Sequence, residues 1–149
     1  MKVEMLDSFT ATGLAVRTTN KKEMDATTAT IGVLWQQFST QVVPKLSEES
    51  NVYGVYTNYD SDHTGEFDVI ACSDDISTEQ LPESTTVSIN SGKYLSFSGE
   101  GEMPQVVIEL WQQIWAYFMS PDCPHQRAFT TDFEHYTSDD AATVYIAIL

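Results

Sequence analysis

The tetrapeptide LWQQ occurs twice in this chain, at Leu34–Gln37 and again at Leu110–Gln113. A shorter match, Ile70–Ala71 with Ile146–Ala147, has the same spacing. Both matches fall at corresponding places in the order of predicted elements, which indicates an internal duplication rather than chance. The repeat therefore decides the predicted fold.

Each copy of LWQQ lies in a segment whose apolar residues recur at helical spacing, which predicts helices over about 27–43 and 104–119. Alternating or apolar segments around them predict strands, at 1–9, 12–18, 52–59, 66–73, 85–99, 126–136 and 142–149. We therefore expect an α+β fold of duplicated β-α-β-β units with a central ligand cleft. The chain is predicted to be one domain of two repeats, about 1–76 and 77–149.

The composition is that of an ordinary globular protein with a strongly acidic balance. The chain has 149 residues, 42% of them hydrophobic, and 22 acidic against 7 basic residues give a net charge of −15. So few basic residues argue against direct nucleic-acid binding. No apolar segment resembles a signal peptide or a membrane span, so we expect a cytoplasmic protein that does not bind a membrane.

No catalytic signature is present. The chain has no G-x-S-x-G motif, no glycine-rich phosphate loop and no H-E-x-x-H motif. Two cysteines and three scattered histidines form neither a disulfide framework nor a metal-ligand pattern. We predict no catalytic residue, no cofactor and no metal site.

The segment 127–136, RAFTTDFEHY, is predicted to be a strand that carries an acidic residue among aromatic ones. Side chains alternate along a strand, so Glu134 shares a face with Asp132 and Tyr136, whereas Arg127 lies on the other face. Glu134 is either an ordinary surface residue or the one charge in a pocket for organic cations. In the second case, burial without a partner raises its pKa or leaves it waiting for a cationic ligand.

The duplication also predicts that the cleft is one-sided. Aligning Tyr59 with Tyr136 places Thr57 at the position equivalent to Glu134. Only the second repeat then carries a carboxylate there, which suits a single cation.

Three segments together resemble the GyrI-like small-molecule-binding domains, which also form the effector-binding part of AraC-type and multidrug-responsive transcription regulators. They are Thr131–Tyr136 followed by Val144–Ile148, the helix segment Trp111–Trp115, and the strand Tyr53–Tyr59. The likeness covers nearly the whole chain. In detail it is similar to stand-alone members carried on integron gene cassettes.

The resemblance implies that Glu134 meets cationic, lipophilic ligands, with Trp111, Tyr56 and Tyr145 as further ligand-binding candidates. Unlike the regulators, this chain has no predicted helix-turn-helix. Transcription control would therefore need a separate regulator partner, and exposed strand edges would permit a homodimer.

Three functions follow as expectations. The favoured one is a stand-alone binding protein that senses or sequesters cationic, lipophilic or aromatic small molecules. The second is a protein-interaction module like the gyrase inhibitors, whose acidic surface meets a basic partner. The third is a GyrI-like hydrolase of electrophilic natural products, in which Glu134 activates a water.

Overall fold

A computed structural model describes every residue from Met1 to Leu149. Its elements follow the chain in this order: β1 (Lys2–Leu6), β2 (Phe9–Thr18), α1 (Asn20–Glu23), α2 (Ile31–Gln41), a 3₁₀ turn η1 (Val43–Lys45), β3 (Val52–Thr57), β4 (Phe67–Ser73), β5 (Thr85–Ile89), β6 (Gly92–Glu100), α3 (Gln105–Met119), β7 (Thr131–Ser138) and β8 (Ala141–Ala147). None of the helices is long and apolar enough to cross a membrane.

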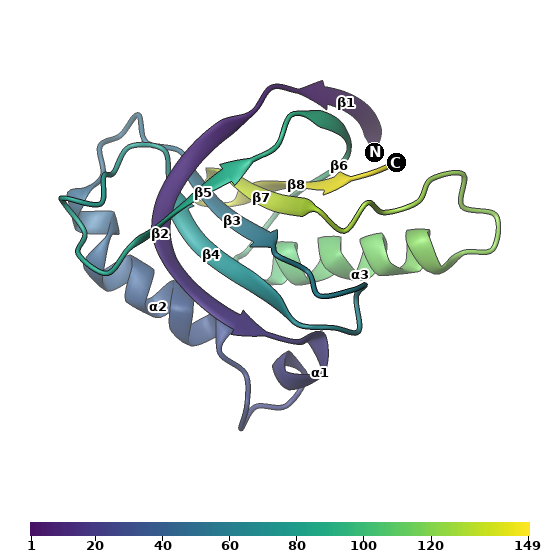
Figure 1. The fold of residues 1–149 in the computed structure, drawn as a ribbon, viewed down its shortest axis with the longest axis horizontal. Helices are drawn as coiled ribbons and strands as arrows, with labels where there is room; N and C mark the ends of the chain where they lie inside the picture. The colour runs from purple at the N-terminus through teal and green to yellow at the C-terminus, as the bar shows by residue number, and fades with distance from the viewer.

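The eight strands form one curled antiparallel sheet in the order β1-β6-β8-β7-β3-β4-β2-β5 (Figure 1). The helices α2 and α3 pack on the same face of this sheet, α2 against β2 and β4 and α3 against β6 and β8. Between the two helices lie the central strands β3 and β7. The α+β fold class predicted from the sequence is confirmed.

The strand order has an internal symmetry about the β3–β7 pair. The edge strand β1 pairs with β6, from Lys2 opposite Ser96 to Leu6 opposite Gly92. The other edge strand, β5, pairs with β2 over the same number of residues. Each half thus contributes an outer strand to the other half. Each half therefore has one more strand than the predicted β-α-β-β unit. The division into repeats of about 1–76 and 77–149 stays a prediction.

Followed through the sheet, this symmetry changes the expected partner of Glu134. The symmetry matches β1 with β5, β2 with β6, β4 with β8 and β3 with β7. When the register of each strand pair is followed from the edge strands to the centre, Gly54 corresponds to Glu134 and Tyr56 to Tyr136. The sequence alignment that matched Thr57 with Glu134 is therefore wrong by three residues along the strand. Gly54 also lies directly opposite Glu134 in the β3–β7 ladder.

The first long helix begins later than predicted, at Ile31 rather than about Thr27. The residues before it form the short helix α1 and a turn, which the sequence pattern did not indicate. At the end of α1, the Glu23 carboxylate accepts hydrogen bonds from the backbone N–H groups of Thr30 and Ile31. Glu23 thereby satisfies free donors at the start of α2, a capping role normally filled by the N-cap residue itself.

The strand predicted from residue 127 begins instead at Thr131. Phe129 has a φ of 52°, in the left-handed region that breaks an extended strand. The chain therefore turns before β7, and Arg127 folds back toward Asp132 instead of pointing to the opposite face. From residue 131 on, the predicted alternation holds.

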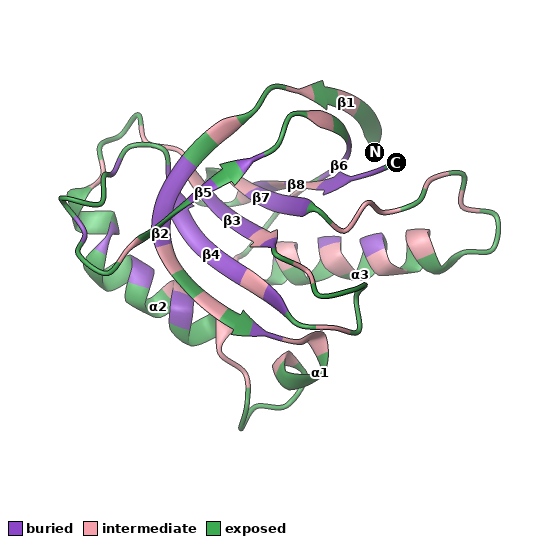
Figure 2. Cartoon of the chain, viewed as in Figure 1, coloured by how far each residue is buried: buried purple, intermediate pink, exposed green.

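Apolar side chains fill both faces of the sheet, and Figure 2 shows buried residues along its central strands. Under α2 and α3 lie two clusters centred on Leu34 and Phe38 and on Leu110 and Ile114. A third cluster, which includes Tyr53, Tyr94 and Phe133, fills the opposite face. The helices are thus held to the sheet at their outer flanks, which leaves the space between them over β3 and β7.

Candidate functional site

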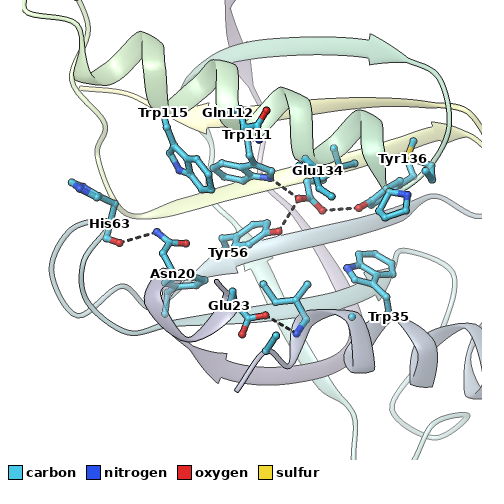
Figure 3. Close-up of a pocket in the computed structure, with 18 of the residues that line it drawn as sticks. Asn20, Glu23, Trp35, Tyr56, His63, Trp111, Gln112, Trp115, Glu134 and Tyr136 are labelled. Atoms are coloured by element: carbon cyan, nitrogen blue, oxygen red, sulfur yellow. Dashed lines mark hydrogen bonds between the residues drawn. The ribbon is translucent and has the colours of Figure 1, made fainter. Parts of the chain in front are cut away.

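A cavity of about 760 Å³ lies between α2 and α3, with the central strands β3 and β7 as its floor (Figure 3). This volume is in the range of sites for drug-sized ligands. All three tryptophans of the chain line it, and the aromatic lining comprises Trp35, Tyr56, Tyr59, Phe67, Trp111, Trp115 and Tyr136. The cavity is therefore largely apolar and aromatic.

Glu134 is the buried carboxylate of this cavity, with 1% of its surface exposed. Its Oε2 accepts hydrogen bonds from the Tyr56 hydroxyl and the Trp111 indole N–H, both at 2.7 Å. Its Oε1 accepts one from the Tyr136 hydroxyl at 2.8 Å (Figure 3). All three donors are neutral, and Glu134 forms no ion pair. The charge of the carboxylate is thus solvated by the protein but not neutralised.

Burial raises the pKa of Glu134, against hydrogen bonds from Trp111, Tyr56 and Tyr136 that act to lower it. Burial, with the nearby carboxylate second, raises the pKa of the Tyr56 and Tyr136 hydroxyls well above the usual value. Both tyrosines therefore stay protonated and remain donors. A ligand cation beside the carboxylate would favour its ionised form.

The aromatic rings are arranged as two matching pairs around the carboxylate. Trp111 meets Tyr56 edge to face with ring centroids 5.0 Å apart, and Trp35 meets Tyr136 in the same way at 5.1 Å. These pairs are related by the symmetry of the sheet, and Glu134 and Gly54 lie between them. The aromatic lining is thus close to symmetric, whereas the charge is on one side only.

A second acid on the same strand face, Asp132, is neutralised within the protein. Its Oδ2 accepts from the Tyr59 hydroxyl at 2.6 Å and forms an ion pair with Arg127 at 2.7 Å. Its Oδ1 accepts from the backbone N–H of Ala147 at 2.8 Å. Asp132 and Glu134 are equally buried, but only Asp132 has its own cation.

One end of the cavity is bordered by polar groups from the N-terminal half. The Asn20 side chain donates to the backbone carbonyl of His63 at 2.8 Å, which ties α1 to the β3–β4 turn (Figure 3). Burial acts to raise the pKa of Glu23, but hydrogen bonds from Thr18, Ile31 and Thr30 together lower it. Glu23 is thus a second acid in the lining, and it is occupied by capping α2.

Three of the four predicted ligand-binding residues lie together. Glu134, Trp111 and Tyr56 meet in the cavity within hydrogen-bond distance. Tyr145 does not line it. It stacks on Phe133 with ring centroids 4.7 Å apart, on the opposite face of the sheet. Its place follows from register, because Tyr145 pairs with Phe133, which alternates with Glu134.

Sequence reasoning missed several lining residues. Tyr136 lies on the predicted face beside Glu134, and Trp35 lies at the repeat position that corresponds to Trp111, but neither was among the predicted ligand-binding residues. Trp115 follows Trp111 by one helical turn, a spacing that places both on one helix face. Arg127 carried no signal, because its place depends on the turn at Phe129. No three His, Cys, Asp or Glu side chains come together as a metal site requires.

The curled sheet and this cavity define an α+β fold of the GyrI-like type. A family model described as "Cass2: Integron-associated effector binding protein" matches residues 2–148. The chain belongs to this family. The resemblance to integron-cassette effector-binding proteins found in the sequence is therefore confirmed.

Solved structures share the whole fold. The integron cassette protein VCH_CASS2, from the mobile metagenome of Vibrio cholerae, is 52% identical with a TM-score of 0.96, over 99% of this chain and 95% of that chain. SAV2435, solved bound to tetraphenylphosphonium, is 17% identical with a TM-score of 0.71, over 99% of this chain and 93% of that chain.

A sequence relative also spans the whole chain. The "Putative transcriptional regulator protein YobU" of Bacillus subtilis (strain 168) is 26% identical over 154 residues, covering 96% of this chain and 94% of YobU.

Proposed function

We propose that this protein is a stand-alone receptor for cationic, lipophilic or aromatic small molecules, which it senses or sequesters. One observation carries the proposal: Glu134 is buried in an aromatic cavity with three neutral donors and no cation of its own. A cation that enters the cavity supplies the missing charge. A neutral molecule of the same shape does not, so the carboxylate favours cations.

The walls of the cavity suit the same ligands. Aromatic faces attract cations by about 0.5–2 kcal/mol each, and more when water is excluded. Trp35, Trp111, Tyr56 and Tyr136 all lie around the carboxylate. The proposal is further supported by SAV2435, a protein of the same fold that was solved with a lipophilic cation, tetraphenylphosphonium.

The alternatives have less support from the geometry. A hydrolase needs Glu134 to bind and activate a water, but protein donors already take three of the roughly four acceptor positions of its carboxylate. The net charge of −15 suits a basic protein partner. The cavity, however, is lined mainly by aromatic and apolar side chains, which suit a small lipophilic ligand better than a basic protein surface. We also propose that the protein is cytoplasmic and acts as a homodimer or with a separate transcription-regulator partner.

Intrinsic fluorescence tests the receptor function directly, because all three tryptophans line the cavity. We expect a rhodamine-type or quaternary cation to quench this fluorescence at micromolar concentrations. In Glu134→Gln, cation affinity should fall at least about tenfold, whereas the affinity for a neutral aromatic compound should change little. Equal losses for both ligands would exclude the cation role of Glu134.

A further inference from the structure

Arg127 lines the same cavity as Glu134 and has hydrogen-bonding capacity that the protein does not use. Its Nη2 donates to Asp132 at 2.7 Å and reaches the Tyr59 hydroxyl at 3.4 Å. Its Nε is buried without any partner, and Nη1 makes no hydrogen bond. A guanidinium has five N–H donors, so most of those on Arg127 remain free.

The guanidinium is held in a fixed position. Its central carbon lies 4.4 Å from the centroid of the Phe129 ring. The centroids of the Tyr59 and Trp111 rings are farther away, at 5.9 and 6.0 Å. Only 8% of the side-chain surface is exposed. Because Arg127 is the cation of the fully buried Asp132, it cannot swing away without leaving that charge unpaired. Its free donors are therefore preorganised.

Trp111 connects this group to Glu134. Its indole N–H donates to the Glu134 carboxylate, and its ring lies against the Arg127 guanidinium. Asp132, which holds Arg127, and Glu134 are two residues apart on one strand face, a separation of about 7 Å. The cavity thus offers an uncompensated negative charge and, across one indole ring, a set of fixed donors.

We propose that the preferred ligands are organic cations that also carry a hydrogen-bond acceptor, a carbonyl or carboxylate oxygen, which accepts from Nη1 of Arg127. The inference rests on the proposed cation role of Glu134 and names the ligand class of that site. Arg127 and Asp132 together are neutral, so the acceptor need not be charged. Nη1, unlike the buried Nε, keeps some exposed surface, so an acceptor that enters the cavity can reach it.

Three dyes with the same cationic core separate the two contributions. Tetramethylrosamine carries a plain phenyl ring, the methyl ester of tetramethylrhodamine adds a carbonyl, and tetramethylrhodamine itself adds a carboxylate. Their affinities are measured by fluorescence titration with the native protein, Arg127→Lys and Glu134→Gln. Arg127→Lys keeps the positive charge for Asp132 but loses the forked donors. Tyr145→Phe, on the opposite face of the sheet, serves as the control variant.

We expect the ester or the carboxylate dye to bind about tenfold tighter than the rosamine, the effect of one hydrogen bond from a charged group. Arg127→Lys should remove this preference, so that the ester and carboxylate dyes bind this variant no more tightly than the rosamine does. Glu134→Gln should lower the affinity for all three dyes. The ester and carboxylate dyes show whether a neutral or a charged acceptor is preferred.

Two results would overturn the inference. The first is equal binding of all three dyes by the native protein, a result that does not depend on whether Arg127→Lys folds. The second is an acceptor preference that Arg127→Lys retains. In both cases the receptor function stands as long as the rosamine binds and Glu134→Gln weakens it. If no dye binds, the receptor function fails together with the inference.

Discussion

Gly54 lies directly opposite Glu134 in the β3–β7 ladder, and a Cβ added at Gly54 would come within 2.5 Å of Oε1 of Glu134. The same Cβ would lie 3.0 Å from the Trp35 ring. The missing side chain on one strand therefore makes room for the carboxylate of the other. The charge of the cavity depends on both residues, although only Glu134 carries it.

Replacing Gly54 tests this dependence. In Gly54→Ala the carboxylate and the Trp35 ring must both shift, so we expect about tenfold weaker cation binding and a loss of about 1–3 kcal/mol in the free energy of unfolding. Chemical denaturation and a cation titration measure the two effects. Gly32→Ala is the control for the stability measurement alone, because its Cβ meets no protein atom within 4 Å and its helical position favours alanine by up to about 1 kcal/mol, but Gly32 also lines the cavity. An unchanged cation affinity in Gly54→Ala would contradict the prediction.

Removing one of the tyrosine hydroxyls that donate to the Glu134 carboxylate should raise the pKa of Glu134 further. Tyr56→Phe and Tyr136→Phe each delete a hydrogen bond that stabilises the ionised form. A titration of the Glu134 side-chain carbonyl followed by NMR measures the change. Tyr145→Phe, whose hydroxyl faces away from the cavity, should leave that pKa unchanged. A lowered pKa in either cavity variant would show that the tyrosines do not act as donors.

Glu134 should make the protein less stable as the pH rises. Its pKa is raised in the folded state, so the folded protein keeps a proton that the unfolded chain releases near the ordinary pKa of 4.5. The resulting contribution to stability is complete below that pH and is lost as the pH rises through the folded-state pKa. Glu134→Gln lacks this loss. Urea denaturation over a pH series should therefore show its stability rising relative to the native protein, and a constant difference would contradict the account.

Asp132, unlike Glu134, should destabilise the folded protein when its cationic partner Arg127 is removed. Arg127→Met leaves a fully buried carboxylate without a cation, which typically costs about 3–5 kcal/mol. Adding Asp132→Asn should restore most of this loss, because the charge that needs Arg127 is then gone. Thermal and chemical denaturation of both variants measure the effect. If Arg127→Met is as stable as the native protein, the ion pair does not hold Asp132 in place.

The sequence was sufficient for the features that depend on local periodicity. Helical spacing located both long helices, and alternation placed Asp132, Glu134 and Tyr136 on one face. The duplicated LWQQ pointed to two corresponding helices with Trp35 and Trp111 at matching positions. The structure brings both tryptophans into one cavity.

Features that depend on pairing between distant segments were beyond the sequence pattern. The opposition of Gly54 and Glu134 is set by the register of β3 and β7, and an alignment by similarity chose Thr57 instead. The left-handed Phe129 turns the chain before β7, so the alternation rule misplaced Arg127. Tyr145 was assigned by family likeness, whereas its register puts it opposite Phe133 and away from the cavity.

The central claim is that Glu134 selects the charge of the ligand, and two ions of nearly equal size and shape test it most directly. Tetraphenylphosphonium is a cation and tetraphenylborate is an anion. Calorimetric titration should show that the native protein binds the phosphonium at least about tenfold more tightly than the borate, and that Glu134→Gln loses most of this preference. The same preference in Glu134→Gln, or tighter binding of the borate by the native protein, would contradict the account.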